Sequence, residues 1–326
     1  MISLVIPTIR DLKFLKEWED QFRENPKLEI IIVEDHEKQT INCPTWDNIT
    51  IYSHKAIRKD LGKDAWIIPI QSDGIRSYGF LKAKGDIIIT LDDDCYPSVY
   101  HDFLDRHEGA LNLKMCNNFY NIFNHPTIQP RGYPYGIREK KKCVLNLGLW
   151  DESPDFDAPT ELYLKHNIAH IPYNNGIVNT GLLVPICIMN VAFRGSILPA
   201  YYQLPSGPYS RFHDIWSGFI IKKIIDYLGD CMSVGEPYID HFKKSNTFTN
   251  LIKESKGIQA NEVMWKVIDS CTFQGTTYAQ CYNDMAFHFT NTVLKHQDNQ
   301  FNNELIDYLF ICSKAMQIWL KLCEKR

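Results

Sequence analysis

The sequence contains no run of about 20 apolar residues, the length that a helix needs to cross a membrane. The nearest approach, residues 176–193, is interrupted by Asn179, Pro185 and Asn190. The opening residues, MISLVIPTIR, lack the basic segment and apolar core of a signal peptide. We therefore expect neither a membrane anchor nor export, and a cytoplasmic location.

Excess positive charge is also missing, because 35 Lys and Arg residues face 39 Asp and Glu residues. Binding to nucleic-acid phosphates requires a basic surface, so we expect no nucleic-acid partner. The ten cysteines are scattered singly, without a Cys-x-x-Cys pair or a Cys/His cluster at zinc spacing. This pattern predicts reduced, mostly buried thiols rather than disulfides or a zinc site.

What the chain does have is an apolar fraction of 44% over 326 residues, which excludes intrinsic disorder. In its first part, strands are predicted at residues 3–7, 29–34, 49–52, 65–70 and 86–91, and helices at 12–22 and 75–84. Several of these strands are nearly continuous apolar runs, as in strands buried on both faces. The pattern predicts a parallel, doubly wound sheet, whose ligands bind beyond the carboxyl ends of its strands.

The middle and the tail of the chain differ from this first part. Residues from about 116 to 237 are richer in Pro, Gly, Asn and aromatics, which predicts long loops and short strands with one helix within 209–228. The tail from about residue 262 is predicted to be helical, and one apolar stripe in it should pack on the body of the protein or on a partner subunit. The stripe comprises Leu305, Tyr308, Leu309, Cys312, Met316, Trp319 and Leu320.

Three adjacent carboxylates, Asp92, Asp93 and Asp94, directly follow the apolar strand at 86–91. Burying them without a partner is costly, and a divalent cation that prefers oxygen ligands removes this cost. Asp92 and Asp94 lie on one side of an extended chain and Asp93 on the other. We expect Asp94 and Asp92 to bind Mn²⁺ or Mg²⁺. Asp92 should also contact the ribose of a nucleotide, and Asp93 should belong to the nucleotide-binding site. An exposed acidic turn is the alternative.

Short sequence blocks occur in a fixed order along residues 1–257. They are VIPTIR at Val5–Arg10, DDDC at Asp92–Cys95, RGYP at Arg131–Pro134 with Arg138 seven residues on, GLW at Gly148–Trp150, PDFDAPT at Pro154–Thr160, MNVAF at Met189–Phe193, HDIWSG at His213–Gly218 and PYIDHFKKSN at Pro237–Asn246. In this series the chain resembles the reversibly glycosylated polypeptides, the UDP-arabinopyranose mutase family (glycosyltransferase family 75).

The resemblance implies an α/β, GT-A-like (Rossmann-like) nucleotide-sugar-binding fold with a mixed central sheet and a C-terminal helical extension. We expect a catalytic domain over 1–257, with a nucleotide-binding half at about 1–115 and a sugar-binding half at about 116–257, followed by the extension over 258–326. It further implies a UDP-sugar substrate, a divalent metal, usually Mn²⁺, a reversibly glycosylated Arg131 and a functionally important Arg138.

Two positions depart from the pattern of the plant members. His213-Asp214 stands where they have two aspartates, and Ser72-Asp73 stands where they read Asp-Ser. We therefore expect the acceptor side to differ from that of the plant members, so the sugar and the mutase activity stay open.

Further candidates for the nucleotide follow the other predicted strands. They are Pro7, Thr8, Arg10, Asp35, Arg76, Lys243 and Lys244. Asp35 is placed to bind uracil, or else caps a turn, and the two lysines meet a diphosphate or form a solvated pair. His241 is the candidate third metal ligand, with a buried, hydrogen-bonded histidine as the alternative.

Four residues are candidates for catalysis: Arg131, Arg138, Asp157 and Asp214. A guanidinium is almost always protonated, so attack by Arg131 on an anomeric carbon requires a nearby carboxylate. Asp155 and Asp157 would either supply this carboxylate or hold sugar hydroxyls. The alternative for Arg131 is a bidentate contact with a diphosphate or a carboxylate. Asp214 is a base, an acceptor for sugar hydroxyls, or else a helix N-cap.

These observations predict a metal-dependent UDP-sugar mutase that interconverts pyranose and furanose forms, with UDP-arabinopyranose as the default substrate. Its sugar would be held transiently on an arginine of the enzyme. A glycosyltransferase or self-glycosylating protein that serves an external acceptor is the first alternative, and a non-catalytic UDP-sugar-binding subunit is the second. The apolar C-terminal stripe is compatible with a homo- or hetero-oligomer.

Overall fold

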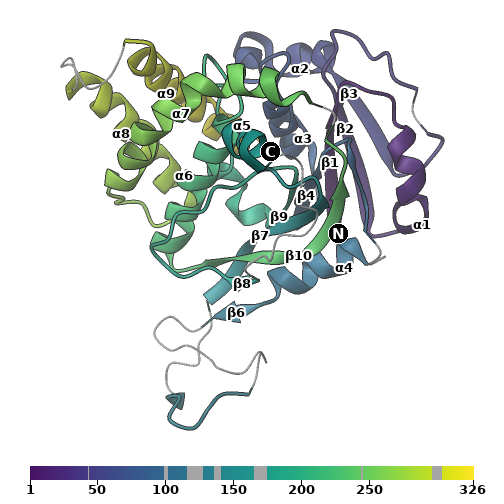
Figure 1. Cartoon of the computed structure of the whole chain (residues 1–326), viewed down its shortest axis with the longest axis horizontal. Helices are drawn as coiled ribbons and strands as arrows, with labels where there is room; N and C mark the ends of the chain where they lie inside the picture. Colours follow the sequence, from purple (N-terminus) through teal and green to yellow (C-terminus); the bar gives the residue numbers. More distant parts are fainter. Residues whose placement is uncertain are drawn as a thin grey trace.

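A computed structural model describes residues 1–42, 44–98, 102–115, 128–135, 141–164, 175–243, 245–295 and 303–326. One large mixed sheet lies at the centre, and helices cover both of its faces (Figure 1). The predicted α/β, Rossmann-like architecture with C-terminal helices is confirmed. Among the described helices, none combines the length and the apolar composition that a membrane span requires.

The sheet has the strand order β3-β2-β1-β4-β9-β7-β10-β5, with β6 and β8 attached to its side. Strands β1 to β4 are parallel, whereas β9 runs antiparallel to both β4 and β7. The carboxyl ends of β1, β2 and β4 therefore lie at one edge. The strands are β1 (Ile2–Thr8), β2 (Leu28–Glu34), β3 (Ile49–Ser53), β4 (Ile87–Leu91), β5 (Cys95–Pro97), β6 (Lys114–Met115), β7 (Lys141–Glu152), β8 (Gly176–Ile177), β9 (Asn190–Arg194) and β10 (Cys231–His241).

The α-helices described are α1 (Glu19–Phe22), α2 (His54–Leu61), α3 (Arg76–Lys82), α4 (Phe103–Leu111), α5 (Ala158–Leu164), α6 (His213–Leu228), α7 (Thr247–Ser270), α8 (Tyr278–Lys295) and α9 (Asn303–Cys323). Short 3-10 helices complete them at η1 (Lys13–Trp18), η2 (Gly62–Ile67), η3 (Asp73–Ile75) and η5 (Gly195–Ala200). Helices α7 to α9 gather on the left of Figure 1, away from α1 and β3.

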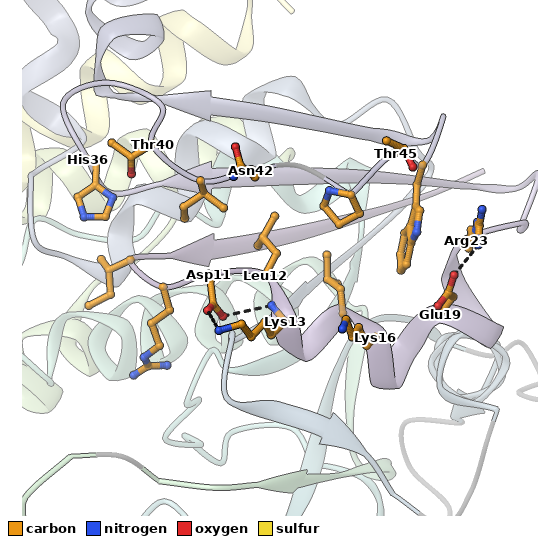
Figure 2. A pocket seen from close by; sticks show the side chains of 16 residues that line it. Asp11, Leu12, Lys13, Lys16, Glu19, Arg23, His36, Thr40, Asn42 and Thr45 are labelled. Carbon is orange, nitrogen blue, oxygen red and sulfur yellow. Dashed lines mark hydrogen bonds and ion pairs between the residues drawn. The ribbon is translucent and has the colours of Figure 1, made fainter.

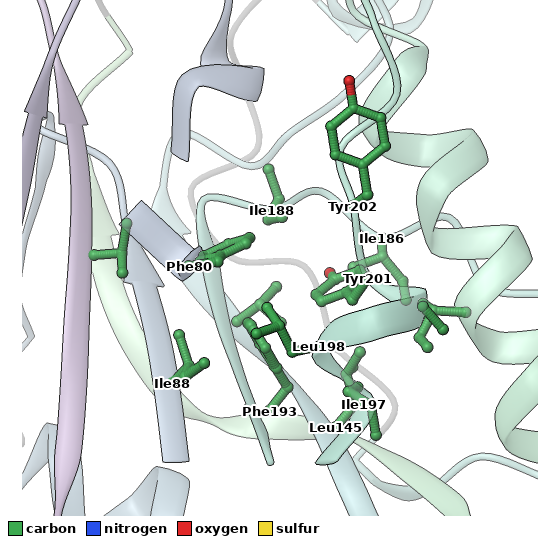
Figure 3. Packing of buried hydrophobic residues seen from close by; sticks show 14 of the residues in the cluster. Phe80, Ile88, Leu145, Ile186, Ile188, Phe193, Ile197, Leu198, Tyr201 and Tyr202 are labelled. Atoms are coloured by element: carbon green, nitrogen blue, oxygen red, sulfur yellow. The ribbon is translucent and has the colours of Figure 1, made fainter. Parts of the chain in front are cut away.

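Helix α3 packs directly on one face of the sheet. A Cβ added to Gly79 would lie 2.4 Å from a methyl group of Val5, so only glycine permits this approach of helix and strand. Beside it, Phe80 meets the ring of Phe193 of β9 edge-on, and Tyr201 packs against both rings (Figure 3). This aromatic layer fixes α3, and with it the segment that enters α3 from the strand edge.

The opposite face of the sheet is covered by η1 and α4. Trp18 of η1 is fully buried between Phe22 and Phe103, and its indole N–H donates to the carbonyl of Cys95. His107 of α4 reaches the sheet and bonds to Asn146 and Asn190 on neighbouring strands. Trp18 of η1, packed against Phe103 of α4, thus fixes Cys95 at the end of the loop that follows β4.

Most of the predicted elements in the first part are confirmed, but one strand prediction is wrong. Residues 65–70 include the end of η2 instead, with Ile67 and Ile68 buried. A short apolar run does not distinguish a strand from a buried helical turn. The middle region also contains more regular structure than expected, since β7 spans Lys141–Glu152, while the predicted helix within 209–228 is α6.

The C-terminal helices pack on the body of the protein, as one of the two sequence alternatives stated. All residues of the predicted stripe on α9 are buried. Trp319 stacks on Tyr202 and donates its indole N–H to the carbonyl of Leu198 in η5. The first C-terminal helix, α7, already begins at Thr247, before the boundary predicted at 257, and the division into domains stays a prediction.

Candidate active site

The three aspartates stand directly after β4, at the carboxyl edge of the sheet. Their loop leads into β5, which pairs with the end of β10 and sets Cys95 opposite His241. The backbone amide of Phe242 also donates to the carbonyl of Asp94. This pairing brings two motifs together that lie far apart in the sequence, as the prediction of a common site required.

Two residues from the end of β1 contact the aspartates. The Thr8 hydroxyl donates to Asp93 at 2.6 Å. Arg10 forms an ion pair with Asp93 and lies 3.2 Å from Asp94 through the same nitrogen, Nη1. In this structure, the guanidinium of Arg10 is therefore a positive charge that faces the carboxylates of Asp93 and Asp94.

Arg76 binds the third aspartate from the other side. Its Nη2 donates to Asp92 at 2.7 Å, its Nη1 donates to Thr90 and to the carbonyl of Ile188, and its Nε donates to the carbonyl of Asp73. The Arg76 side chain is 1% exposed. In this arrangement Arg76 fixes the position of Asp92, and its predicted contact with a diphosphate is untested.

The geometry at His241 and Asp94 suits a cation. Nδ1 of His241 lies 2.7 Å from the carbonyl of Ser153, and because a carbonyl only accepts, Nδ1 carries the proton. Nε2, the other ring nitrogen, faces Oδ1 of Asp94 at 3.7 Å, too far for a hydrogen bond. An imidazole nitrogen and a carboxylate oxygen at this distance are a suitable donor set for Mn²⁺ or Mg²⁺.

The electrostatics of the aspartates agree with this interpretation. Burial raises the pKa of Asp94, and the neighbouring Asp92 carboxylate raises it further, against the opposing effects of His241 and Arg10. Burial also raises the pKa of Asp93, although Thr8 and Arg10 counteract it. Within the described part of the chain, no three His, Cys, Asp or Glu side chains form a complete metal site. A cation here would therefore need oxygen ligands from a substrate as well.

Asp35, the uracil candidate at the end of β2, is buried in a hydrogen-bond network of its own. Its Oδ1 lies 2.6 Å from Nε2 of His54, and its Oδ2 accepts from the backbone amide of Ser72 at 3.1 Å. Ser72 in turn caps η3 by accepting from the amide of Gly74. The network connects the end of β2 to the segment that carries Asp73 and Arg76.

An open pocket of about 710 Å³ lies beside this edge of the sheet (Figure 2). One wall is formed by residues 9–13 and by η1 and α1, and the other by His36 and the connection between β2 and β3. Arg10 lines the pocket and also contacts the aspartates, so the pocket adjoins the predicted metal site. Its volume falls in the range of small-molecule sites, about 300–1,000 Å³.

Asp214 lies in the first turn of α6, next to His213. Nε2 of His213 bonds to Asp73 at 2.7 Å. Burial raises the pKa of Asp214 to about 6, and Asp73 and Asp155 add to the shift, which His213 and the amide of Ile215 only partly oppose. Oδ1 of Asp214 is shielded from solvent and accepts no hydrogen bond from the described residues. A carboxyl group in this state is suited to exchange protons near neutral pH.

The remaining described candidates make contacts with residues other than the three aspartates. Asp157 caps α5 by accepting from the amide of Thr160 at 2.8 Å, and Lys243 forms an ion pair with Glu161 of that helix. Pro7 pairs with β2 inside β1. Arg131 is exposed in a turn, and among the described residues no bond joins it to another candidate. Arg138 and Lys244 lie outside the described residues.

Sequence reasoning missed two residues near Asp155. Arg211, which precedes α6, has a positive φ of 71° and lies 3.9 Å from Asp155 through Nη2. Its Nε donates to the buried Glu254 of α7 at 2.6 Å. Neither residue belongs to a recognisable motif, because their association depends on how α7 packs against α5 and α6.

Comparison with known proteins agrees with this arrangement. A family model described as reversibly glycosylated polypeptide matches residues 1–326. The chain belongs to this family. The resemblance inferred from the ordered motifs is thereby confirmed, and it extends through the C-terminal helices.

Several relatives carry a name that states an activity. The chain is 35% identical to probable UDP-arabinopyranose mutase 2 of Solanum tuberosum over 303 residues, which cover 87% of this chain and 82% of that protein. It is 35% identical to UDP-arabinopyranose mutase 1 of Arabidopsis thaliana, over 87% of this chain and 84% of the relative. Probable UDP-arabinopyranose mutase 4 of Arabidopsis thaliana is 32% identical to this chain, and the match covers 99% of this chain and 90% of that protein.

Proposed function

We propose that this chain is an isomerase-type enzyme, a UDP-sugar mutase that interconverts pyranose and furanose forms, with UDP-arabinopyranose as its substrate. The observation that carries the proposal is the set of Asp94, His241, Arg10 and Thr8 at the carboxyl edge of the sheet, in a chain whose relatives are named UDP-arabinopyranose mutases. We include a cytoplasmic location in this proposal, supported by the scattered single cysteines.

The nucleotide would lie across the carboxyl edge of β1, β2 and β4. The pocket next to Arg10 offers space for the nucleoside, and Arg10 can turn from the aspartates to a diphosphate because its side chain is 36% exposed. A guanidinium binds phosphate oxygens in a bidentate way. Asp92, held by Arg76, is placed to accept from a ribose hydroxyl.

Asp94 and His241 would hold a divalent cation, together with oxygens of the diphosphate. When bound, the cation would offset the negative charge that develops on the departing diphosphate. Thr8 supports this function by donating to Asp93, which leaves Asp94 oriented toward His241.

Conversion of the ring requires balanced bond changes. The bond from C1 to the β-phosphate oxygen breaks, and a C1–N bond to Arg131 forms while the guanidinium loses a proton to a carboxylate. Ring opening breaks C1–O5 with proton uptake at O5, and closure forms C1–O4 with proton loss from O4. Attack of a β-phosphate oxygen of UDP on C1 then breaks the C1–N bond, and the nitrogen of Arg131 takes its proton back from the carboxylate. A single group that starts ionised, such as Asp214, can accept the proton from Arg131, give it to O5, accept one from O4 and return it to Arg131.

Incubation with UDP-arabinopyranose and Mn²⁺, without any acceptor, tests the proposal. We expect UDP-arabinofuranose to accumulate to an equilibrium mixture, as measured by separating the nucleotide sugars by chromatography. Chelation of the metal should stop the conversion. Release of UDP, or a labelled chain without ring conversion, would instead indicate a glycosyltransferase, and binding of UDP without turnover would indicate a non-catalytic subunit.

The role of Arg131 requires a separate experiment. Arg131→Ala and Arg131→Lys should both abolish incorporation of radiolabelled sugar into the chain and strongly lower ring conversion, because lysine restores the charge but not the guanidinium nitrogen. Arg58→Ala, which removes another exposed arginine, serves as the control. Normal labelling and conversion in Arg131→Ala would exclude this arginine as the carrier of the sugar.

A further inference from the structure

Glu254 of α7 connects two segments of the sugar-binding half. Its side chain is 3% exposed, and both carboxylate oxygens are used. One accepts from Nε of Arg211 at 2.6 Å, and the other accepts from the backbone amide of Ala158 at 2.7 Å. A single buried carboxylate from the C-terminal helices thus holds the start of α5 and the segment that leads into α6.

Helix α7 holds the second of these segments at another point as well. A Cβ added to Gly257 would lie 2.2 Å from the ring of Phe212, so α7 and the residue before α6 are in close contact. Gly257 follows Glu254 by about one helical turn and lies on the same side of α7. These contacts fix the backbone at residues 211 and 212, directly before His213 and Asp214.

The backbone of Arg211 is strained. Its φ of 71° is a value that non-glycine residues adopt rarely, and such strain persists only where surrounding contacts enforce it. The contacts here are those of Glu254, and their result is that Nη2 of Arg211 lies 3.9 Å from Oδ1 of Asp155. The Arg211 and Asp155 side chains are 31% and 28% exposed, so both still reach solvent.

A series of contacts connects Asp155 with two aspartates of the candidate site. Arg211, which lies 3.9 Å from Asp155, is followed closely in the chain by Asp214. His213 bonds to Asp73, whose backbone carbonyl accepts from Arg76, and Arg76 binds Asp92. The carboxylate of Asp155 also contributes to the raised pKa of Asp214. Asp92 belongs to the nucleotide side, so Asp155 and Asp214 lie on the side where a sugar attached to the diphosphate would extend.

We propose that Glu254 and Arg211 position Asp155 opposite Asp214, and that these two carboxylates bind the hydroxyl groups of the sugar ring. This inference rests on the proposed UDP-sugar function and extends it. Carboxylate oxygens accept hydrogen bonds from sugar hydroxyls, and a pair held at fixed positions distinguishes hydroxyl arrangements. The C-terminal helices thereby determine sugar recognition, with Glu254 and Arg211 as positioning residues and Asp155 and Asp214 in contact with the substrate.

Binding measurements by isothermal titration calorimetry, with UDP and with UDP-arabinopyranose in the presence of Mn²⁺, test this inference without requiring turnover. In Asp155→Asn and Glu254→Gln we expect the Kd for UDP-arabinopyranose to rise about tenfold, the effect of losing one charge-assisted hydrogen bond, while the Kd for UDP changes by less than about twofold. Glu304→Gln is the matched control, because it removes an exposed carboxylate of α9 that pairs with Lys256 of α7, the helix that carries Glu254.

A double variant separates positioning from general damage. If Glu254 acts through Asp155, adding Glu254→Gln to Asp155→Asn should weaken binding no further. Equal loss of UDP and UDP-arabinopyranose binding, or additive effects, would overturn the inference. Asp155→Asn leaves α7 intact and keeps the test valid where Glu254→Gln fails to fold. If the wild-type chain binds UDP but no UDP-sugar, the proposed function itself is wrong, whereas normal sugar binding by the folded variants contradicts only the role of these residues.

Discussion

Replacing Asp94 with asparagine should lower kcat for ring conversion by about 10²–10³-fold, the range for loss of one group that stabilises developing charge. The amide keeps the size of the side chain but removes the negative charge that faces Nε2 of His241 at 3.7 Å. Without that charge, the site binds a divalent cation poorly, and the departing diphosphate loses its counter-charge. Initial rates at saturating UDP-arabinopyranose, measured over a range of Mn²⁺ concentrations, give both kcat and the metal dependence.

Asp86→Asn is the matched control for this change. Asp86 directly precedes β4, whereas Asp94 follows the other end of this strand. Asp86 is highly exposed, and its carboxylate pairs with the N-terminal amine at 3.4 Å. We expect normal rates and normal metal dependence in this variant. A fully active Asp94→Asn enzyme with unaltered response to Mn²⁺ would show that the aspartates hold no catalytic cation.

Asp214→Asn should reduce kcat by about 10²–10⁴-fold, the contribution of a well-placed acid or base. Because the pKa of Asp214 is raised to about 6, the group passes from mostly protonated at pH 5 to mostly ionised at pH 7. A base must be ionised, so the wild-type rate should rise with pH through about 6. A pH–rate profile between pH 4.5 and 8 measures this rise in rate. The residual activity of the asparagine variant should not show the rise.

Asp269→Asn provides the comparison for Asp214. It removes an exposed carboxylate that lies 3.6 Å from Lys223 of α6, the helix that begins with His213 and Asp214. Its pH profile should match that of the wild-type chain. If the rate of Asp214→Asn still rises with pH through about 6, another group causes the rise and Asp214 is excluded as the base.

The sequence was sufficient to predict the part of the fold that positions the nucleotide site. The apolar runs that became β1, β2 and β4 end in Thr8, Glu34 and Leu91, and parallel order alone places those ends at one edge. The run at 65–70 was misassigned because hydrophobicity reports burial and not backbone conformation. The length of β7 was also missed, since the composition of the surrounding region suggested loops.

The candidate site was predicted unevenly for a similar reason. Thr8, Arg10, Asp93, Asp94 and His241 were identified from motifs. The pairing of β1 with β4 brings Thr8 and Arg10 to Asp93, and the pairing of β5 with β10 brings His241 to within 3.7 Å of Asp94. That contact could not be derived from spacing, because β5 has only three residues. Contacts that depend on helix packing left no local signal at all. Glu254, for instance, lies in an ordinary helical stretch, and its importance follows only from the backbone amide and the guanidinium that it binds.

The position of α9 also has a consequence for biosynthesis. Trp319 lies 121 residues after Leu198 in the sequence, yet it covers η5 and stacks on Tyr202. Until the ribosome has produced residues 303–323, the apolar surface of η5 is exposed on the nascent chain. Such surfaces promote aggregation of incomplete chains and recruit chaperones. Newly made copies of this protein therefore complete their core late, after the segments that form the carboxyl edge of the sheet have already been translated.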